Sequence, residues 1–165
     1  MVVAKMRCMS VTRTWDKVEG VELQPVHAKS NGDVIPENRV FWNATPSGKL
    51  EFYTAMPSAH GRYEPGEYYK LSFEDGEPDP FVGHVTRWYV SSVHLHSARV
   101  GVGHVGSGEV QCHPDWIKPE GEVDVNRETW EKYVNGTMRL SINNVKALDW
   151  FTVGKVFQLR ITPSE

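Results

Sequence analysis

Hydrophobic and polar residues alternate along several short stretches of this chain, and a period of two is typical of strands that bury one face. These stretches cover residues 50–54, 69–73, 138–142 and 157–161. Helix signals are confined to residues 38–45, 57–61 and 126–134. The pattern therefore predicts an all-β or β-rich fold, with at most one or two short helices in each half of the chain.

The second half of the chain repeats the first at an offset of 88 residues, because residues 38–74 align without a gap on residues 126–162. In each copy an asparagine suited to cap a helix precedes a glycine suited to end it, and a strand, a connector, a glycine turn and a second strand follow. The identical pairs are Asn38/Asn126, Arg39/Arg127, Trp42/Trp130, Gly48/Gly136, Ala59/Ala147, Gly66/Gly154 and Leu71/Leu159. These matches favour an internal duplication, although unrelated helix-strand-strand stretches with glycine turns align about as well.

The repeat is weaker at the front of each half. Ser10 and Val11 match Ser92 and Val93 at an offset of 82, whereas residues 22–24 match residues 109–111 at an offset of 87. Between the halves, residues 74–80 are acidic and rich in proline, which is typical of an exposed connector. We therefore expect two similar small antiparallel β modules in tandem, each a sandwich or barrel-like unit. They cover residues 1–74 and 88–165, with a connector at 75–87.

Composition and charge exclude several classes of protein. Apolar residues make up 39% of the 165 residues and charged residues 24%, which describes a globular chain. The net charge of −3 provides no global attraction to nucleic acid or to an anionic membrane, so we expect neither as a partner. Lys5 and Arg7 interrupt the apolar residues near the start, and no run approaches the roughly 20 apolar residues of a membrane span. We expect synthesis in the cytosol, with Cys8 and Cys112 reduced.

Histidines are the first candidates for a metal site. His94 and His96 lie two positions apart, a spacing that directs both imidazoles to one face of a strand. His104, Cys112 and His113 could complete a coordination shell, which would suit a metal-dependent enzyme. Nothing in the sequence brings these residues together, however, and exposed or hydrogen-bonded strand histidines are the favoured interpretation. We therefore predict no metal site.

Motifs for nucleophilic or cofactor chemistry are missing from the sequence. There is no Gly-x-Ser-x-Gly elbow and no phosphate-binding loop. The spaced glycines of residues 101–106 open no amphipathic helix, and a flexible hairpin loop is the favoured interpretation. The prediction is a protein that is not an enzyme and that binds no cofactor.

Aromatic residues make up 11% of the chain, and four of them lie beside predicted loops or outside the matched positions of the repeat. These residues are Trp88, Tyr89, Trp116 and Trp150. Core packing explains many aromatic residues in a small β domain. Tryptophan and tyrosine are also enriched at protein interfaces, so these four are the candidate binding residues.

Residues 6–74 resemble a family of small, mostly uncharacterised β-rich proteins of tailed bacteriophages. The features that carry the resemblance are Ser10-Val11, the Asn-led segment 38–41, the Thr-Pro-Ser-Gly turn at 45–48, the alternating strand 50–54, and Pro65-Gly66 followed by Tyr68-Tyr69. The second half departs from the pattern, because Val153-Gly154 stands where Pro-Gly is expected. Its membership of the family rests on the internal repeat alone.

The resemblance implies a phage-encoded protein and supplies no catalytic residues. We expect a virion structural protein, such as a capsid decoration or cement protein, that binds the major capsid protein or another virion protein. It would be found in the virion, or in the host cytoplasm before assembly, and homo-oligomerisation is left open. The alternative is an intracellular inhibitor that binds a host defence protein or sequesters a small ligand.

Overall fold

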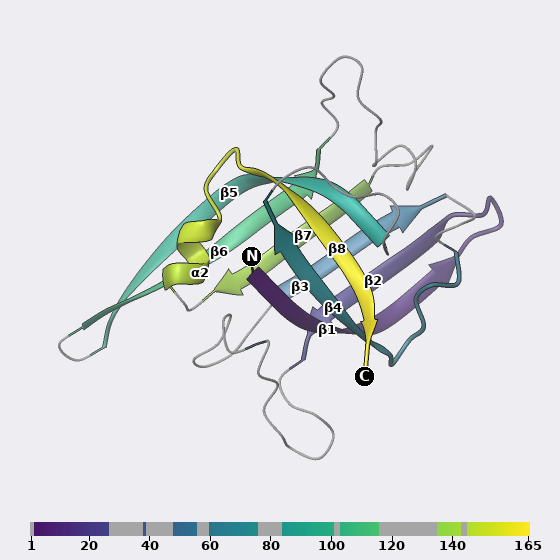
Figure 1. Ribbon diagram of the computed structural model, residues 1–165, viewed down its shortest axis with the longest axis horizontal. Helices are drawn as coiled ribbons and strands as arrows, with labels where there is room; N and C mark the ends of the chain where they lie inside the picture. Colours follow the sequence, from purple (N-terminus) through teal and green to yellow (C-terminus); the bar gives the residue numbers. More distant parts are fainter. Residues whose placement is uncertain are drawn as a thin grey trace.

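The computed structural model describes residues 2–26, 38, 48–55, 60–75, 84–100, 103–115, 135–142 and 145–165, which form a closed barrel of eight antiparallel strands (Figure 1). The strands are β1 (Val2–Arg13), β2 (Glu19–Pro25), β3 (Gly48–Thr54), β4 (Tyr68–Glu74), β5 (His84–Val100), β6 (Gly103–Pro114), β7 (Asn135–Ile142) and β8 (Val156–Ser164). One short helix, α2 (Val145–Trp150), precedes β8. The β-rich prediction is confirmed.

Strands from both halves of the chain build one wall, in the order β1-β2-β3-β7-β6-β5-β8-β4, and β4 closes against β1. The first half contributes β4-β1-β2-β3 and the second half the matching series β8-β5-β6-β7. The halves meet where β3 pairs with β7 and where β4 pairs with β8. Two separate modules in tandem are therefore not confirmed, because both halves enclose a single core. The second half also starts earlier than expected, since β5 begins at His84 within the predicted connector 75–87.

The 88-residue repeat reappears in the register of the strands. Leu50 pairs with Met138 and Ser72 pairs with Arg160, and the members of each pair are 88 positions apart. On either side of these two pairs, the ladders run through equivalent residues in opposite directions. A pseudo-twofold axis through both pairs therefore relates one half of the barrel to the other.

Equivalent backbone contacts occur at the turn before the last strand of each half. The Gly66 N–H donates to the carbonyl oxygen of Cys8, and the Gly154 N–H donates to that of Val90, both at 2.8 Å. Their φ angles are 95° and 83°, a region that glycine adopts without a steric cost. The glycine turns expected from the repeat thus have the same conformation in both halves, and they bond to equivalent strands, β1 in the first half and β5 in the second.

The front strands are also equivalent. The ladders of β1 and β5 shift register at residues 8–10 and 90–92, which agrees with the predicted offset of 82. The offset of 87 for the second strands is wrong. Leu23 pairs with Cys8 in the first half and Cys112 pairs with Val90 in the second, and Cys8 and Val90 are the equivalent residues just before the register shift. Leu23 and Cys112 are 89 positions apart, and the weak similarity of β2 and β6 hid the true alignment.

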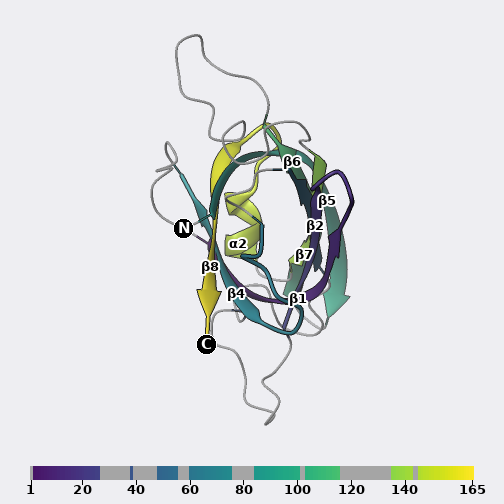
Figure 2. The same cartoon turned by 90° about the vertical axis from the view of Figure 1, so that its right-hand side faces the viewer.

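Inward-facing side chains fill the barrel, and a connector closes each end. The largest fully buried side chains of the wall are Phe52, Phe73, Trp88 and Phe157. Tyr63, before β4, packs against Phe52 at 5.3 Å between ring centroids, and its equivalent Phe151, before β8, packs against Phe73 at 5.5 Å. Figure 2 shows α2 within the outline of the ring of strands. The centre of the barrel is thus a packed hydrophobic core.

Asn38 is buried and its side chain contacts backbone of the barrel wall. Its Oδ1 accepts from the Lys5 N–H at 2.6 Å, and its Nδ2 donates to the carbonyl oxygens of Lys5 and Val26 at 2.8 and 2.7 Å. The helices predicted to follow Asn38 and Asn126 lie outside the described residues. Asn38 therefore has a role in the wall that the capping prediction did not include.

Candidate functional site

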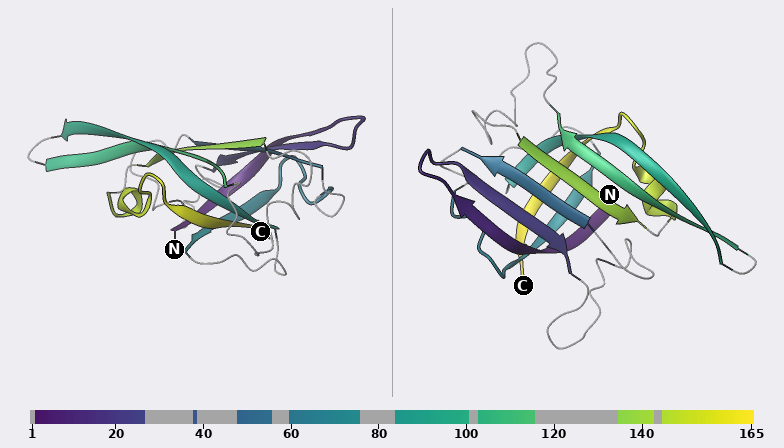
Figure 3. Two further views of the ribbon diagram at one scale, coloured as in Figure 1. Left: turned by 90° about the horizontal axis from the view of Figure 1, so that it is seen from above. Right: turned by 180° about the vertical axis from the view of Figure 1, so that it is seen from behind.

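The β5–β6 ribbon, residues 96–100 and 103–107, extends away from the barrel at one end (Figures 1 and 3). β5 pairs with β8 only over residues 84–89, and β6 pairs with β7 only over residues 108–112. β5 and β6, in contrast, pair with each other as far as Val100 and Gly103. Among the described strands the ribbon therefore has no neighbour on either side. Its two edges present backbone N–H and C=O groups that suit the addition of a partner strand.

A shorter hairpin projects at the opposite end of the barrel, between β1 and β2 (Figure 3). The Lys17 N–H donates to the Thr14 carbonyl oxygen at 3.1 Å, and the Thr14 N–H donates to the Val18 carbonyl oxygen at 3.0 Å. The Thr14 hydroxyl also donates to the Val18 carbonyl oxygen, and this bond fixes the turn further. Lys17 has a φ of 64°, as expected for a type I turn followed by a left-handed residue.

This ordered turn presents Trp15 to solvent, with 96% of its surface exposed. Burial of an indole is worth several kcal/mol of hydrophobic free energy, and a lone tryptophan at a rigid tip is a typical anchor for a protein partner. The sequence analysis did not select Trp15. The signal that could have found it is an aromatic residue in a short polar turn between two alternating stretches.

Three of the four aromatic residues selected from the sequence are described by the structure, and they lie in different surroundings. Trp88 is 0% exposed and its Nε1 donates to Thr86 Oγ1 at 2.7 Å, so the prediction that it lies near a surface is wrong. Its inward position in β5 is equivalent to that of Met6 in β1. Tyr89 is half-buried, with its ring 6.1 Å from that of His113. Trp116 lies outside the described residues.

Trp150, the fourth candidate, is half-buried and held by its own chain. Its Nε1 donates to Asp75 Oδ2 at 3.2 Å, and the Lys155 ammonium lies 3.6 Å from the centre of its ring. Lys155 and Asp75 also form an ion pair at 2.9 Å. Because the indole is already occupied by a cation and an acceptor, Trp150 belongs to a structural cluster of the second half.

The histidines and cysteines form no metal site in the part of the chain that the structure describes. His94 is exposed on β5, and the side chain of His96 lies outside the described residues. No group of three or more His, Cys, Asp or Glu side chains is placed to hold a metal ion there. Cys8 and Cys112 are free and buried, as expected for reduced thiols, and burial raises the pKa of Cys112 to about 12.

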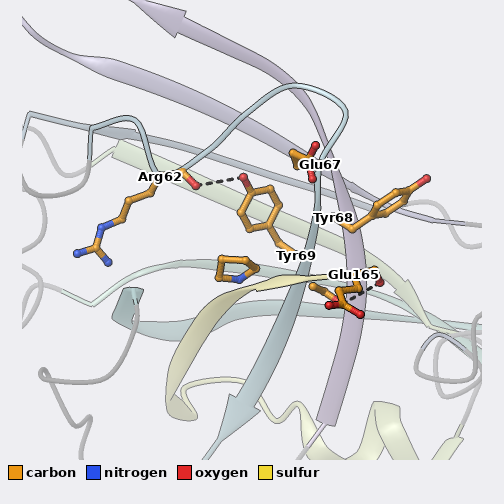
Figure 4. A pocket seen from close by; sticks show the side chains of 7 residues that line it. Arg62, Glu67, Tyr68, Tyr69 and Glu165 are labelled. Carbon is orange, nitrogen blue, oxygen red and sulfur yellow. Dashed lines mark hydrogen bonds between the residues drawn. The ribbon is translucent and has the colours of Figure 1, made fainter.

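A groove of about 410 Å³ lies beside the paired ends of β4 and β8, where Tyr68 pairs with Ser164 (Figure 4). Its lining is Arg62, Glu67, Tyr68, Tyr69, Pro163, Ser164 and Glu165, and we call it the β4–β8 groove. The Tyr69 hydroxyl donates to the Arg62 carbonyl oxygen at 3.1 Å and accepts from the Glu64 N–H at 2.9 Å, which fixes the floor. Tyr69 is 4% exposed and its ring packs on that of Tyr63 at 5.0 Å, whereas the Tyr68 ring has the Lys5 ammonium at 5.3 Å, so both rings already contact side chains of the same chain.

No protein-family model and no curated protein matches this chain. Within the described residues, no helix has the length and hydrophobicity needed to cross a membrane. The candidate functional features are therefore the β5–β6 ribbon, Trp15 and the β4–β8 groove, all on the outside of the barrel.

Proposed function

We propose that the protein is a structural protein of a tailed-phage particle, and that the β5–β6 ribbon attaches it to the major capsid protein or to another virion protein. The observation that carries the proposal is the ribbon itself, which leaves the barrel and has no neighbouring strand on either edge among the described strands. An isolated two-stranded ribbon is at best marginally stable in water, so a partner strand would stabilise it. The resemblance of residues 6–74 to tailed-phage proteins supports the particle as the place of binding.

Attachment by strand addition suits a decoration protein. Backbone hydrogen bonds supply affinity, and the many identical sites of a capsid or tail lattice supply repeated partners. The eight described strands close into a barrel, so the ribbon is the longest part of the described wall that is suited to this pairing. On this proposal the protein acts by binding and has no catalytic step.

The test combines quantitative mass spectrometry of purified virions with a particle-binding assay. We expect many copies of the protein per particle, and recombinant protein should sediment with particles that lack it. A variant in which Asn-Gly replaces residues 96–107 removes the ribbon and keeps every ladder between β5 and β8 and between β6 and β7. It should melt near the temperature of the parent and lose sedimentation with particles.

Two results would overturn the proposal. Absence of the protein from virions would favour the alternative, an intracellular inhibitor. Thermal-shift screens with nucleotides and with host extract are then the next measurement. Undiminished binding of the ribbon-deleted variant would show that another surface makes the contact. The Val153→Ser variant changes an exposed apolar side chain outside the ribbon and serves as the matched control, since it should bind particles like the parent.

A further inference from the structure

One edge of β5 has no neighbouring strand from Ser92 onward among the described strands. β8 pairs with β5 over residues 84–89, and the next backbone bonds on that side join Val90 to Gly154 and Lys155. Beyond them, β5 pairs with β6 alone as far as Val100. Natural sheet edges are often protected by lysine or proline. Residues 92–98 contain neither, and we call them the open β5 edge.

The open β5 edge has nearly the same sequence when read from Leu95 in either direction. His94 and His96 flank Leu95, and small or β-branched residues follow on both sides. Two antiparallel copies of this edge, related by a twofold axis at Leu95, would pair through all seven residues. Leu95 would then lie opposite Leu95 of the second copy, and His94 would lie opposite His96 of the second copy.

Such pairing covers an exposed apolar side chain. Leu95 is 74% exposed and lies on the same face of β5 as Val93, which packs partly against the core. In the pair the two leucines meet and extend the apolar face that Val93 begins in each copy. The open β5 edge contains no Asp, Glu, Lys or Arg, so no like charges oppose the contact.

The opposite face of the same pair gathers four histidine positions. Residues 94 and 96 share a face of β5 because alternate residues of a strand do, and His94 is exposed there. Opposite Cβ atoms are about 5 Å apart, and positions two residues apart on one strand are about 7 Å apart. Imidazoles at the corners of such a rectangle can converge on one ion, with nitrogen about 2.0–2.1 Å from zinc. One chain supplies only two of the four positions.

A carboxylate adjoins this histidine cluster. Glu109 is paired with His94 across β5 and β6, so it lies on the same face. A carboxylate beside a metal-binding histidine favours the bound cation and can accept the second imidazole N–H. Imidazole ligands suit zinc, nickel and copper ions.

We propose that two copies pair along the open β5 edge and that His94 and His96 of both copies bind one zinc ion. The site is incomplete without the second copy. In this dimer the β6 edge of the ribbon, residues 103–107, stays free for the attachment proposed above. The dimer does not rest on that attachment, because it concerns the purified protein in the absence of particles.

Sedimentation velocity with zinc and with EDTA tests the proposal, together with zinc analysis of the separated dimer. We expect zinc to convert the protein to a dimer that holds one zinc ion per two chains, and EDTA to reverse this. His94→Ala should weaken zinc-dependent association at least about tenfold, because it removes two of the four ligands. His113→Ala, which removes a histidine of β6 outside the open β5 edge, is the matched control and should dimerise like the parent.

Two variants of Leu95 test the strand pairing itself, and the exposure of this side chain favours a folded product. Leu95→Lys places two like charges opposite each other and should prevent the dimer although all histidines remain. Leu95→Cys places two thiols opposite each other and should form a disulfide between copies faster with zinc than with EDTA. Absence of a zinc-dependent dimer of the parent, or undiminished dimers of His94→Ala or Leu95→Lys, would overturn the proposal.

Discussion

Replacement of Asn38 by alanine tests whether the Asn38 side chain continues the hydrogen bonding of β1 past the last residue of β2. The last pair of that ladder is Met6 with Pro25, so the Lys5 backbone has no further residue of β2 opposite it. The Asn38 carboxamide takes that place, with three hydrogen bonds of 2.6–2.8 Å to the backbone of Lys5 and Val26. Asn38 is only 1% exposed, which limits replacement of these bonds by water.

The expected magnitude follows from the groups that would lose a partner. The Lys5 carbonyl oxygen also accepts from the Val26 N–H at 3.2 Å, so it remains bonded in Asn38→Ala. The Lys5 N–H and the Val26 carbonyl oxygen lose the bonds that Asn38 makes. A buried group left without a partner costs about 1–3 kcal/mol, and we expect the free energy of unfolding to fall by about 3 kcal/mol. For a chain of this size the melting temperature should fall by about 6–12 °C.

Urea unfolding followed by circular dichroism measures the loss, and hydrogen exchange of the Lys5 amide locates it. Asn38→Asp keeps an acceptor for the Lys5 N–H but directs a second oxygen at two carbonyl groups, so it should be at least as destabilising at neutral pH. Thr152→Ala, at an exposed position, should change the free energy of unfolding by less than about 0.5 kcal/mol. The reasoning is refuted if Asn38→Ala also changes the free energy of unfolding by less than about 0.5 kcal/mol and the Lys5 amide stays protected from hydrogen exchange.

Two further predictions concern Lys17 and Cys112. Because Lys17 has a φ of 64°, Lys17→Gly should raise the free energy of unfolding by about 0.5–1 kcal/mol in urea, whereas Lys17→Ala should not; a loss with glycine would contradict this. Burial raises the pKa of Cys112 to about 12, so the folded protein retains a proton that the unfolded chain releases above about pH 8.5. The free energy of unfolding should therefore fall as the pH rises from about 8.5, by at most about 1.4 kcal/mol per pH unit from this group. Cys112→Ala should show a shallower slope, and equal slopes would contradict the assignment.

The strands could be predicted from the sequence, but their closure into one barrel could not. Alternation over residues 50–54 and 138–142 identifies the buried face of β3 and β7, yet it carries no information about which strand lies beside which. A four-stranded half would expose two open edges, a liability for any sheet. The halves remove both edges by pairing β3 with β7 and β4 with β8. The duplication could therefore be recognised from the sequence, whereas the closure of the two halves into one barrel depends on contacts between distant residues that the sequence pattern does not reveal.

The candidate site was harder to predict because exposure of an aromatic side chain depends on its phase within a strand. Trp88 alternates with Thr86 and Val90, and all three are buried, so the pattern contained its inward position. The groove, in contrast, depends on the pairing of β4 with β8, and no local pattern predicts it. Trp15 is an intermediate case, since the sequence indicates a turn there but not the hydrogen bonds that make the turn rigid.

The two halves retain residues where the backbone requires them. A Cβ atom added to Gly48 would lie 3.0 Å from Pro25 Cγ, and one added to Gly136 would lie 3.0 Å from Trp88 Cη2. Both distances are shorter than ordinary van der Waals contact, so glycine preserves the close approach of the strands in each half. Identity at these positions is thus explained by the shared barrel.

Side chains differ between the halves where they meet solvent, so the two halves of one barrel present different features to a partner. The first half has the exposed Trp15 at the tip of a short hairpin, whereas the second half has the longer β5–β6 ribbon in the equivalent place. The ribbon lies at the opposite end of the barrel from Trp15, because the pseudo-twofold axis relates the two hairpins. The same backbone plan therefore supports two unlike surfaces at its two ends.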